Sequence, residues 1–151
     1  MSLVIFLDID GVLNNDPWLD KAGFGTLDPA NVQMLIRLLQ LVDADLVISS
    51  DWRTFYSYEE LCHRLVSEGI PERFIGITPC LDVEGENDDE VFPRGLEIDA
   101  WLRNNNFDGV FCILDDRVDM EPHNDKLVQT DSHYGLVASD IAKAVSRLTC
   151  K

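Results

Sequence analysis

Four aspartates follow two apolar segments of the sequence. Asp8 and Asp10 come after the first segment, and Asp115 and Asp116 come after the second. Parallel strands bring their carboxyl ends to one edge of a sheet, where open α/β sheets bind their ligands. Two carboxylates about 4 Å apart repel each other by roughly 4 kcal/mol at an effective dielectric of 20, and four repel more strongly. We therefore expect a cation at this edge.

The donor atoms of this group indicate which cation it would hold. Carboxylate oxygens favour Mg²⁺ over zinc or copper, and Mg²⁺ is commonly held by one or two carboxylates together with water and substrate phosphate. The hydroxyls of Ser49 and Ser50 close a third apolar segment and are expected at the same edge. The chemistry that this set favours is phosphoryl transfer, with Mg²⁺ as the cofactor.

The segments that must position these side chains have the pattern of strands buried on both faces. Continuous apolar runs rich in β-forming residues cover 3–7, 45–50 and 110–114. Shorter runs at 74–77 and 127–129 predict two further strands. The sequence therefore predicts about five strands.

Helical patterns separate the strands. An N-cap followed by proline at Asp28 opens a helix of about 14 residues, and a capping box at Ser57 opens a second helix. Two more helices are expected at roughly 95–104 and 141–148, and a polar loop at 82–90. This alternation predicts an α/β fold in a single domain: a three-layer, Rossmann-like, doubly wound parallel sheet of about five strands with right-handed crossovers.

Four short motifs resemble those of the haloacid dehalogenase (HAD) superfamily. The segment Asp8-Ile9-Asp10-Gly11-Val12 after an apolar strand resembles its D-x-D-G-[VT] signature. In the family's order, Ser49 resembles the second-motif Ser/Thr, Arg94 the Lys or Arg before the fourth motif, and Asp115-Asp116 the acidic pair. One such motif is common by chance, whereas four in order on matching elements are specific.

The resemblance extends to a subgroup. Residues 49–53 and 94–102 are similar to the small, capless HAD domains of RNA-repair polyproteins. Only about 17 residues separate Asp10 from the helix at Asp28, so no segment is long enough for a large cap domain. An open site is therefore expected.

The resemblance implies a role for each carboxylate. Asp8 would attack phosphorus to form an aspartyl-phosphate, and Asp10 would act first as general acid and then as general base. Mg²⁺ would be held by Asp8, by the backbone carbonyl of Asp10, and by either Asp115 or Asp116.

The resemblance also implies contacts with the phosphoryl group. Ser49 would donate to a phosphoryl oxygen and Arg94 would balance the transferring charge, with Ser50 and Arg53 as further phosphate-binding residues. For Arg53 a surface ion pair with Asp51 is the alternative.

Charge limits the partners that the protein can bind. Its 28 acidic and 12 basic residues give a formal charge of −16, which repels polyanions and anionic membranes. We expect no membrane partner and no extended nucleic-acid-binding face. A divalent metal and a few arginines can still reverse the sign within one pocket. A phosphorylated small molecule or a nucleic-acid end therefore remains a compatible substrate.

The cysteines and the N-terminal segment indicate the compartment. The four cysteines, Cys62, Cys80, Cys112 and Cys150, form no C-x-x-C pair, which argues against structural zinc. The apolar run at 3–7 is too short to span a membrane and lacks the basic flank of a signal peptide. We expect a cytoplasmic protein with reduced thiols.

Taken with the resemblance, these patterns predict a Mg²⁺-dependent phosphomonoester hydrolase. The substrate would be a small phosphomonoester or the terminal phosphate of a nucleotide or nucleic acid. One alternative is a catalytically silent, metal-binding HAD-fold interaction domain, against which the intact Asp8 and Asp10 argue. Another is a receiver domain, but receiver domains carry their acceptor aspartate on a later strand.

Overall fold

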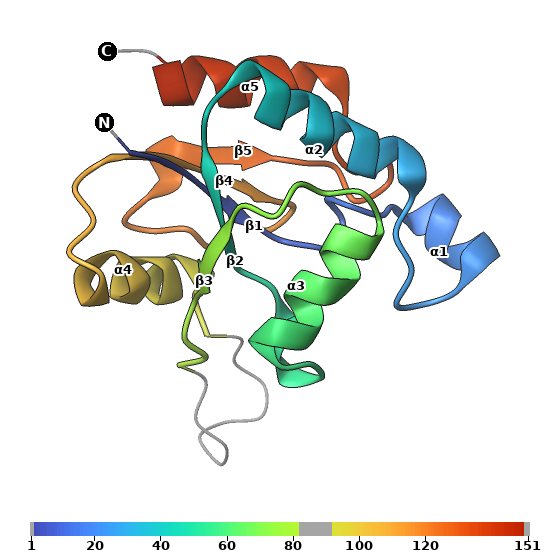
Figure 1. Cartoon of the computed structure of the whole chain (residues 1–151), viewed down its shortest axis with the longest axis horizontal. Helices are drawn as coiled ribbons and strands as arrows, with labels where there is room; N and C mark the ends of the chain where they lie inside the picture. Colours follow the sequence, from blue (N-terminus) through green and yellow to red (C-terminus); the bar gives the residue numbers. More distant parts are fainter. Residues whose placement is uncertain (1, 82–91, 150–151) are drawn as a thin grey trace.

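A five-stranded sheet with all neighbouring strands parallel forms the centre of the computed structural model, which describes residues 2–81 and 92–149 (Figure 1). The strand order is β3-β2-β1-β4-β5. The predicted polar loop at 82–90 lies outside the described residues, as does Cys150. The strands are β1 (Leu3–Leu7), β2 (Asp45–Ile48), β3 (Phe74–Ile77), β4 (Val110–Asp115) and β5 (Leu127–Gln129).

Helices cover both faces of this sheet. Helices α2, α3 and α5 contribute to the larger apolar cluster on one face, whereas α4 contributes to a smaller cluster on the other. Helices α2 and α5 run side by side (Figure 1). The predicted three-layer, Rossmann-like α/β fold without a large cap is confirmed. The helices are α1 (Asp16–Ala22), α2 (Pro29–Leu41), α3 (Tyr58–Ser67), α4 (Arg94–Asn104) and α5 (Ala138–Thr149), with 3₁₀ helices η1 (Asp51–Thr54) and η2 (Asn124–Lys126).

Strand β1 is central because every residue of its inner part is apolar. Val4 and Phe6 pack into the α4 cluster, and Ile5 and Leu7 pack into the cluster on the opposite face. All four side chains are fully buried, which is the alternation that a strand between two helical layers requires. The strand thus carries Asp8 out of the middle of the core.

The register of the three central strands fixes which residues meet at the edge of the sheet. Leu7 of β1 pairs with Ile48 of β2 and with Leu114 of β4. The next residues continue this pairing: the Asp8 N–H donates to the Leu114 carbonyl at 3.0 Å, and the Ser49 N–H donates to the Leu7 carbonyl at 2.8 Å. The residues that directly follow β1 and β2 therefore stand at the same edge of the sheet as the end of β4, with Asp8 between Ser49 and β4.

One unpredicted helix and one helix boundary differ from the prediction. Helix α1 was not predicted; it begins after Asn15, whose side chain accepts from the Trp18 N–H. Helix α5 begins three residues before the predicted start at Ile141, because the Asp140 carboxylate accepts from the Val137 N–H and caps the first turn. In both places a polar cap, and not apolar periodicity, starts the helix.

Candidate active site

Three carboxylates meet where β1 and β4 end. One oxygen from each of Asp8, Asp115 and Asp116 lies within 4.8 Å of the others. Asp8 and Asp115 are buried and Asp116 is half-buried. Within residues 2–81 and 92–149, no other group of three or more Cys, His, Asp or Glu side chains is spaced to hold a metal ion. The structure thus brings together three of the four predicted aspartate side chains.

Ionisation of the carboxyl groups in this cluster is unfavourable without a cation. Burial, followed by the charge of Asp115, raises the pKa of Asp8 well above its usual range, and Arg94 offsets this only in part. Burial and Asp115 likewise raise the pKa of Asp116 to about 6. An all-oxygen set in which two of the three carboxylates resist ionisation fits a hard divalent cation such as Mg²⁺.

Arg94 is the internal counter-ion of the carboxylates. Its side chain is 2% exposed, and its Nη1 lies 3.2 Å from an Asp8 oxygen and 3.1 Å from Asp115 Oδ2. Its Nη2 lies 2.9 Å from Asp51 Oδ1. Its Nε is buried without a hydrogen-bond partner among the described residues. Sequence reasoning placed Arg94 at the site but did not anticipate that three carboxylates surround it.

Close backbone packing brings Arg94 into this position. The Arg94 N–H donates to Asp119 Oδ2 at 3.1 Å, and the Gly95 N–H donates to the Asp119 carbonyl at 2.9 Å. A Cβ on Gly95 would lie 2.3 Å from the Met120 backbone, far inside contact distance. Glycine is therefore required for the first turn of α4 to approach this segment.

Substituting Gly95 with Ala should destabilise the fold by about 1–3 kcal/mol, because the added methyl group must push α4 away from Met120. The measurement is the free energy of unfolding in denaturant. Leu96→Ala is the matched control, since the next side chain is exposed. Equal losses in the two variants would contradict the packing role of Gly95.

The Asp10 carboxylate points to a different set of partners. Its Oδ1 accepts from Asn14 Nδ2 at 2.9 Å, and its Oδ2 accepts from the indole Nε1 of Trp52 at 3.0 Å. Its side chain is not part of the three-carboxylate group. Neither donor, Asn14 or Trp52, was assigned a role from the sequence.

The remaining predicted phosphate-binding residues have different environments. Ser49 Oγ is buried without a hydrogen-bond partner in the described part of the chain. Ser50 Oγ accepts from the Trp52 N–H at 3.2 Å and caps η1. Arg53 contacts both carboxylate oxygens of Glu97, at 2.6 and 2.7 Å. Ser50 and the terminal nitrogens of Arg53 are thus engaged within the fold, whereas Ser49 Oγ and Arg53 Nε have no partner among the described residues.

Arg53 does not form the surface ion pair with Asp51 that the sequence left open. Asp51 pairs with Arg94, whereas Arg53 is almost buried against Glu97 and also donates to Thr78 Oγ1 at 2.7 Å. Glu97 lies one turn after Arg94 on the same helix. The Arg53–Glu97 pair thus ties η1 to the helix that carries Arg94.

The structure shows why the first motif has glycine at position 11. The Gly11 φ of +80° lies in the left-handed region, and a Cβ there would lie 2.4 Å from Asp116 Oδ2. Its carbonyl accepts from Thr130 Oγ1 at 2.7 Å. Backbone conformation and space both require glycine, and this close approach seats Asp116 against the turn that follows Asp8.

Comparison with known families agrees with this geometry. A family model described as "HAD domain in Swiss Army Knife RNA repair proteins" matches residues 4–141. The chain belongs to this family. No curated protein and no solved structure shows a significant match. Membership supports a HAD-type, phosphatase-like function at the level of the superfamily. HAD proteins generally use Mg²⁺, and the buried acidic group of this HAD domain has the ligands to bind it.

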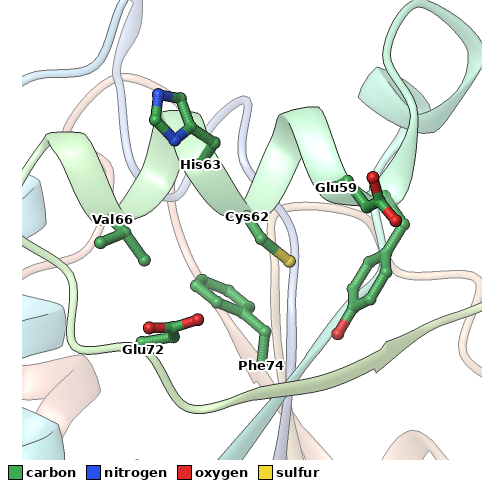
Figure 2. Close-up of a pocket in the computed structure, with 7 residues that line it drawn as sticks. Glu59, Cys62, His63, Val66, Glu72 and Phe74 are labelled. Atoms are coloured by element: carbon green, nitrogen blue, oxygen red, sulfur yellow. The ribbon is translucent and has the colours of Figure 1, made fainter.

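A second hollow of this HAD domain lies apart from the acidic group. A groove of about 410 Å³ runs between α3 and β3. Figure 2 shows Cys62 facing Phe74 across it, whereas His63 points away. None of the aspartates of the candidate active site lines this groove. In the described part of the chain, no helix is long and apolar enough to cross a membrane.

The thiols of this HAD domain should differ sharply in reactivity. Burial raises the pKa of Cys112 to about 12, whereas Cys80 is exposed. Because the thiolate is the reactive form, iodoacetamide should label Cys80 in the folded protein and Cys112 only after unfolding. Peptide mass spectrometry measures both rates. Labelling of Cys112 at the rate of Cys80 would contradict the structure.

Proposed function

We propose that this protein is a Mg²⁺-dependent phosphomonoester hydrolase that acts through an aspartyl-phosphate on Asp8. The observation that carries the proposal is the position of Asp8 at the end of the central strand, beside both Arg94 and the acidic pair. Its substrate is a small phosphomonoester or the terminal phosphate of a nucleotide or nucleic acid. The family's description as a domain of RNA-repair proteins is compatible with the latter.

Asp8 is held as a nucleophile would be. Its Oδ1 accepts from the Ile9 N–H at 2.8 Å and lies 3.2 Å from Arg94 Nη1, which fixes the carboxylate plane. Oδ2, the oxygen that does not accept from the Ile9 N–H, is then the one that attacks phosphorus. The new Oδ2–P bond forms as the bond from phosphorus to the leaving oxygen breaks.

Asp10 supplies and recovers the proton. In the first step its carboxyl gives a proton to the leaving oxygen. In the second step its carboxylate takes a proton from the water that attacks phosphorus. The Oδ2–P bond of Asp8 then breaks, and inorganic phosphate leaves.

Asp8, Asp115 and Asp116 would hold Mg²⁺, together with the backbone carbonyl of Asp10. When bound, Mg²⁺ supplies positive charge that neutralises the phosphoryl oxygens. The donor set supports this assignment, because Arg94 alone does not supply enough positive charge for three clustered carboxylates, and the pKa values of Asp8 and Asp116 are raised. Arg94 provides the remaining positive charge.

Ser49 and Arg94 also support phosphate binding. A buried hydroxyl without a partner costs about 1–3 kcal/mol, and Ser49 Oγ is in this position. The buried Nε of Arg94 lacks a partner in the same way. A phosphoryl oxygen would satisfy both donors. We propose that Ser50 and Arg53 act indirectly, by shaping η1 and by anchoring α4 through Glu97.

The charge of the protein restricts how a substrate is held. A formal charge of −16 opposes contact with a long polyanion, so binding must concentrate on the phosphate itself. We therefore propose that short or small phosphomonoesters are turned over at least as well as long oligonucleotides, and that added salt improves activity on the latter.

Replacing Asp10 with Asn should lower turnover of an alkyl phosphate by about 10²–10⁴-fold, because the amide cannot give a proton to the leaving oxygen. The two side chains have nearly the same size, so the fold should persist. The measurement is kcat beside the circular dichroism spectrum. A folded variant with wild-type kcat would exclude Asp10 as the general acid.

The proposed function is tested by release of inorganic phosphate from an aryl phosphate, with Mg²⁺ and with EDTA. Turnover that requires Mg²⁺ is the expected result. A folded protein that binds Mg²⁺ but turns over neither aryl phosphates, nucleotides nor end-phosphorylated oligonucleotides would instead support the catalytically silent binding domain.

A further inference from the structure

Asp10 receives one hydrogen bond from a residue 42 positions away, in an element that follows a different strand. Trp52 lies in η1 after β2, and its indole N–H donates to Asp10 Oδ2 at 3.0 Å. The other oxygen accepts from Asn14 Nδ2 at 2.9 Å. We propose that Trp52, helped by Asn14, is the positioning residue that aims the Asp10 carboxyl at the leaving oxygen of the substrate. This inference rests on the proposed function.

The Trp52 side chain is itself fixed in position, so it can orient the Asp10 carboxyl. Its side chain is 3% exposed and belongs to the main apolar cluster. Its backbone N–H donates to Ser50 Oγ at 3.2 Å, and its carbonyl accepts from the N–H groups of Phe55 and Tyr56, both at 3.0 Å. The indole therefore cannot turn away from Asp10 without disturbing η1 and the core.

Asn14 is fixed in a similar way. It is fully buried, and its Oδ1 accepts from the Gly11 N–H at 2.9 Å. Its Nδ2 donates to the Thr26 carbonyl at 3.1 Å as well as to Asp10. Two rigid donors thus form hydrogen bonds to the two oxygens of the Asp10 carboxyl and restrict its rotation.

The chemistry of the two donors also restricts where a proton on Asp10 can lie. An indole N–H and an amide N–H donate only, so neither can accept a proton from Asp10. An acidic proton on Asp10 must therefore occupy a lone pair that faces neither Trp52 nor Asn14. Fixing the carboxyl plane fixes that lone pair too, and proton transfer depends steeply on such alignment.

This role predicts a dependence on the leaving group. An alkoxide needs the proton as it departs, whereas 4-nitrophenolate departs readily without it. Loss of the indole N–H should therefore slow hydrolysis of an alkyl phosphate much more than hydrolysis of 4-nitrophenyl phosphate. A purely structural defect would slow both substrates by the same factor.

The test compares three variants on the two substrates. Trp52→Phe removes the N–H together with some volume, and Trp52→benzothienylalanine removes the N–H while keeping the shape, which guards against loss of the fold. Trp101→Phe is the matched control, because Trp101 is also a buried tryptophan, in the α4 cluster on the other face of the sheet.

The expected result is that the ratio of kcat/KM for 4-nitrophenyl phosphate to that for an alkyl phosphate rises at least about tenfold in both Trp52 variants. It should stay at the wild-type value in Trp101→Phe. An unchanged ratio in a folded Trp52→benzothienylalanine variant would overturn the inference.

A second readout does not depend on activity. The indole ¹H–¹⁵N resonance of Trp52 should move upfield in Asp10→Ala, where its acceptor is gone, while that of Trp101 stays in place. An unmoved Trp52 resonance would overturn the inference even in an active enzyme. If the wild type hydrolyses none of the phosphates although the resonance shifts as expected, the proposed function is wrong. The hydrogen bond between Trp52 and Asp10 would then stand, but its catalytic role would not.

Discussion

Asp8→Asn should abolish phosphomonoester turnover, with kcat/KM reduced by at least about a thousandfold. An amide oxygen is too weak a nucleophile to attack phosphorus, so the covalent step is lost. The Asn side chain can still accept from the Ile9 N–H, as Asp8 Oδ1 does at 2.8 Å, which should preserve the local backbone. The measurement is phosphate release with Mg²⁺ from an aryl phosphate.

The same substitution should not destabilise the protein in the absence of metal. Burial, and then Asp115, raise the pKa of Asp8 in the folded state. The charged Asp8 therefore lowers stability progressively as the pH rises from about 4, the ordinary carboxyl value, to its raised folded value. With EDTA present, the Tm of Asp8→Asn should equal or exceed that of the wild type near neutral pH, and this advantage should shrink in acid.

Asp125→Asn is the control, because this aspartate is exposed on η2 and is not part of the three-carboxylate group. It should change neither turnover nor Tm. Retention of more than a tenth of wild-type turnover by a folded Asp8→Asn would contradict the nucleophile assignment. A large drop in its metal-free Tm would contradict the account of charge repulsion.

Arg94→Met should produce the largest loss of stability, about 3–5 kcal/mol in the absence of metal. Met keeps much of the aliphatic length, but it leaves Asp8 and Asp115 buried without their counter-ion. Removing one partner of a buried ion pair costs far more than the pair itself contributes. The free energy of unfolding in denaturant, measured with EDTA, is the test.

Mg²⁺ should partly rescue this variant. Because the cation binds the same carboxylates, saturating Mg²⁺ should raise the Tm of Arg94→Met more than that of the wild type. Arg103→Met is the matched control on the same helix: its side chain is 80% exposed and pairs with Asp99, so the substitution should cost less than about 1 kcal/mol. Equal losses in the two variants would contradict the role of Arg94 as internal counter-ion.

Much of the fold can be predicted from the sequence because the strands are buried on both faces. The continuous apolar run of β1 matches its observed bounds, as do the short runs of β3 and β5. The runs that end in polar residues were less well bounded: β2 ends at Ile48, and Ser49 and Ser50 lie beyond it. Helix α1 escaped prediction because it has no buried residue and hence no apolar periodicity.

The candidate site was predictable in its carboxylates but not in their partners. Strand ends and motif order are local signals, and they indicated Asp8, Asp115 and Asp116. The contact between Asp10 and Trp52 depends on how η1 turns after β2, for which 3.6-residue or two-residue periodicity gives no signal. The pairing of Arg53 with Glu97 likewise depends on where α4 packs.

The most direct test of the central claim is chemical trapping of the covalent intermediate. The wild type is quenched during turnover of an aryl phosphate with Mg²⁺ and treated with borohydride, which reduces an acyl-phosphate to the alcohol. We expect Asp8 alone to be converted to homoserine, as read from peptide mass spectra, and EDTA to prevent the conversion. Full turnover with an unmodified Asp8, or with the modification at another carboxylate, would contradict the nucleophile assignment.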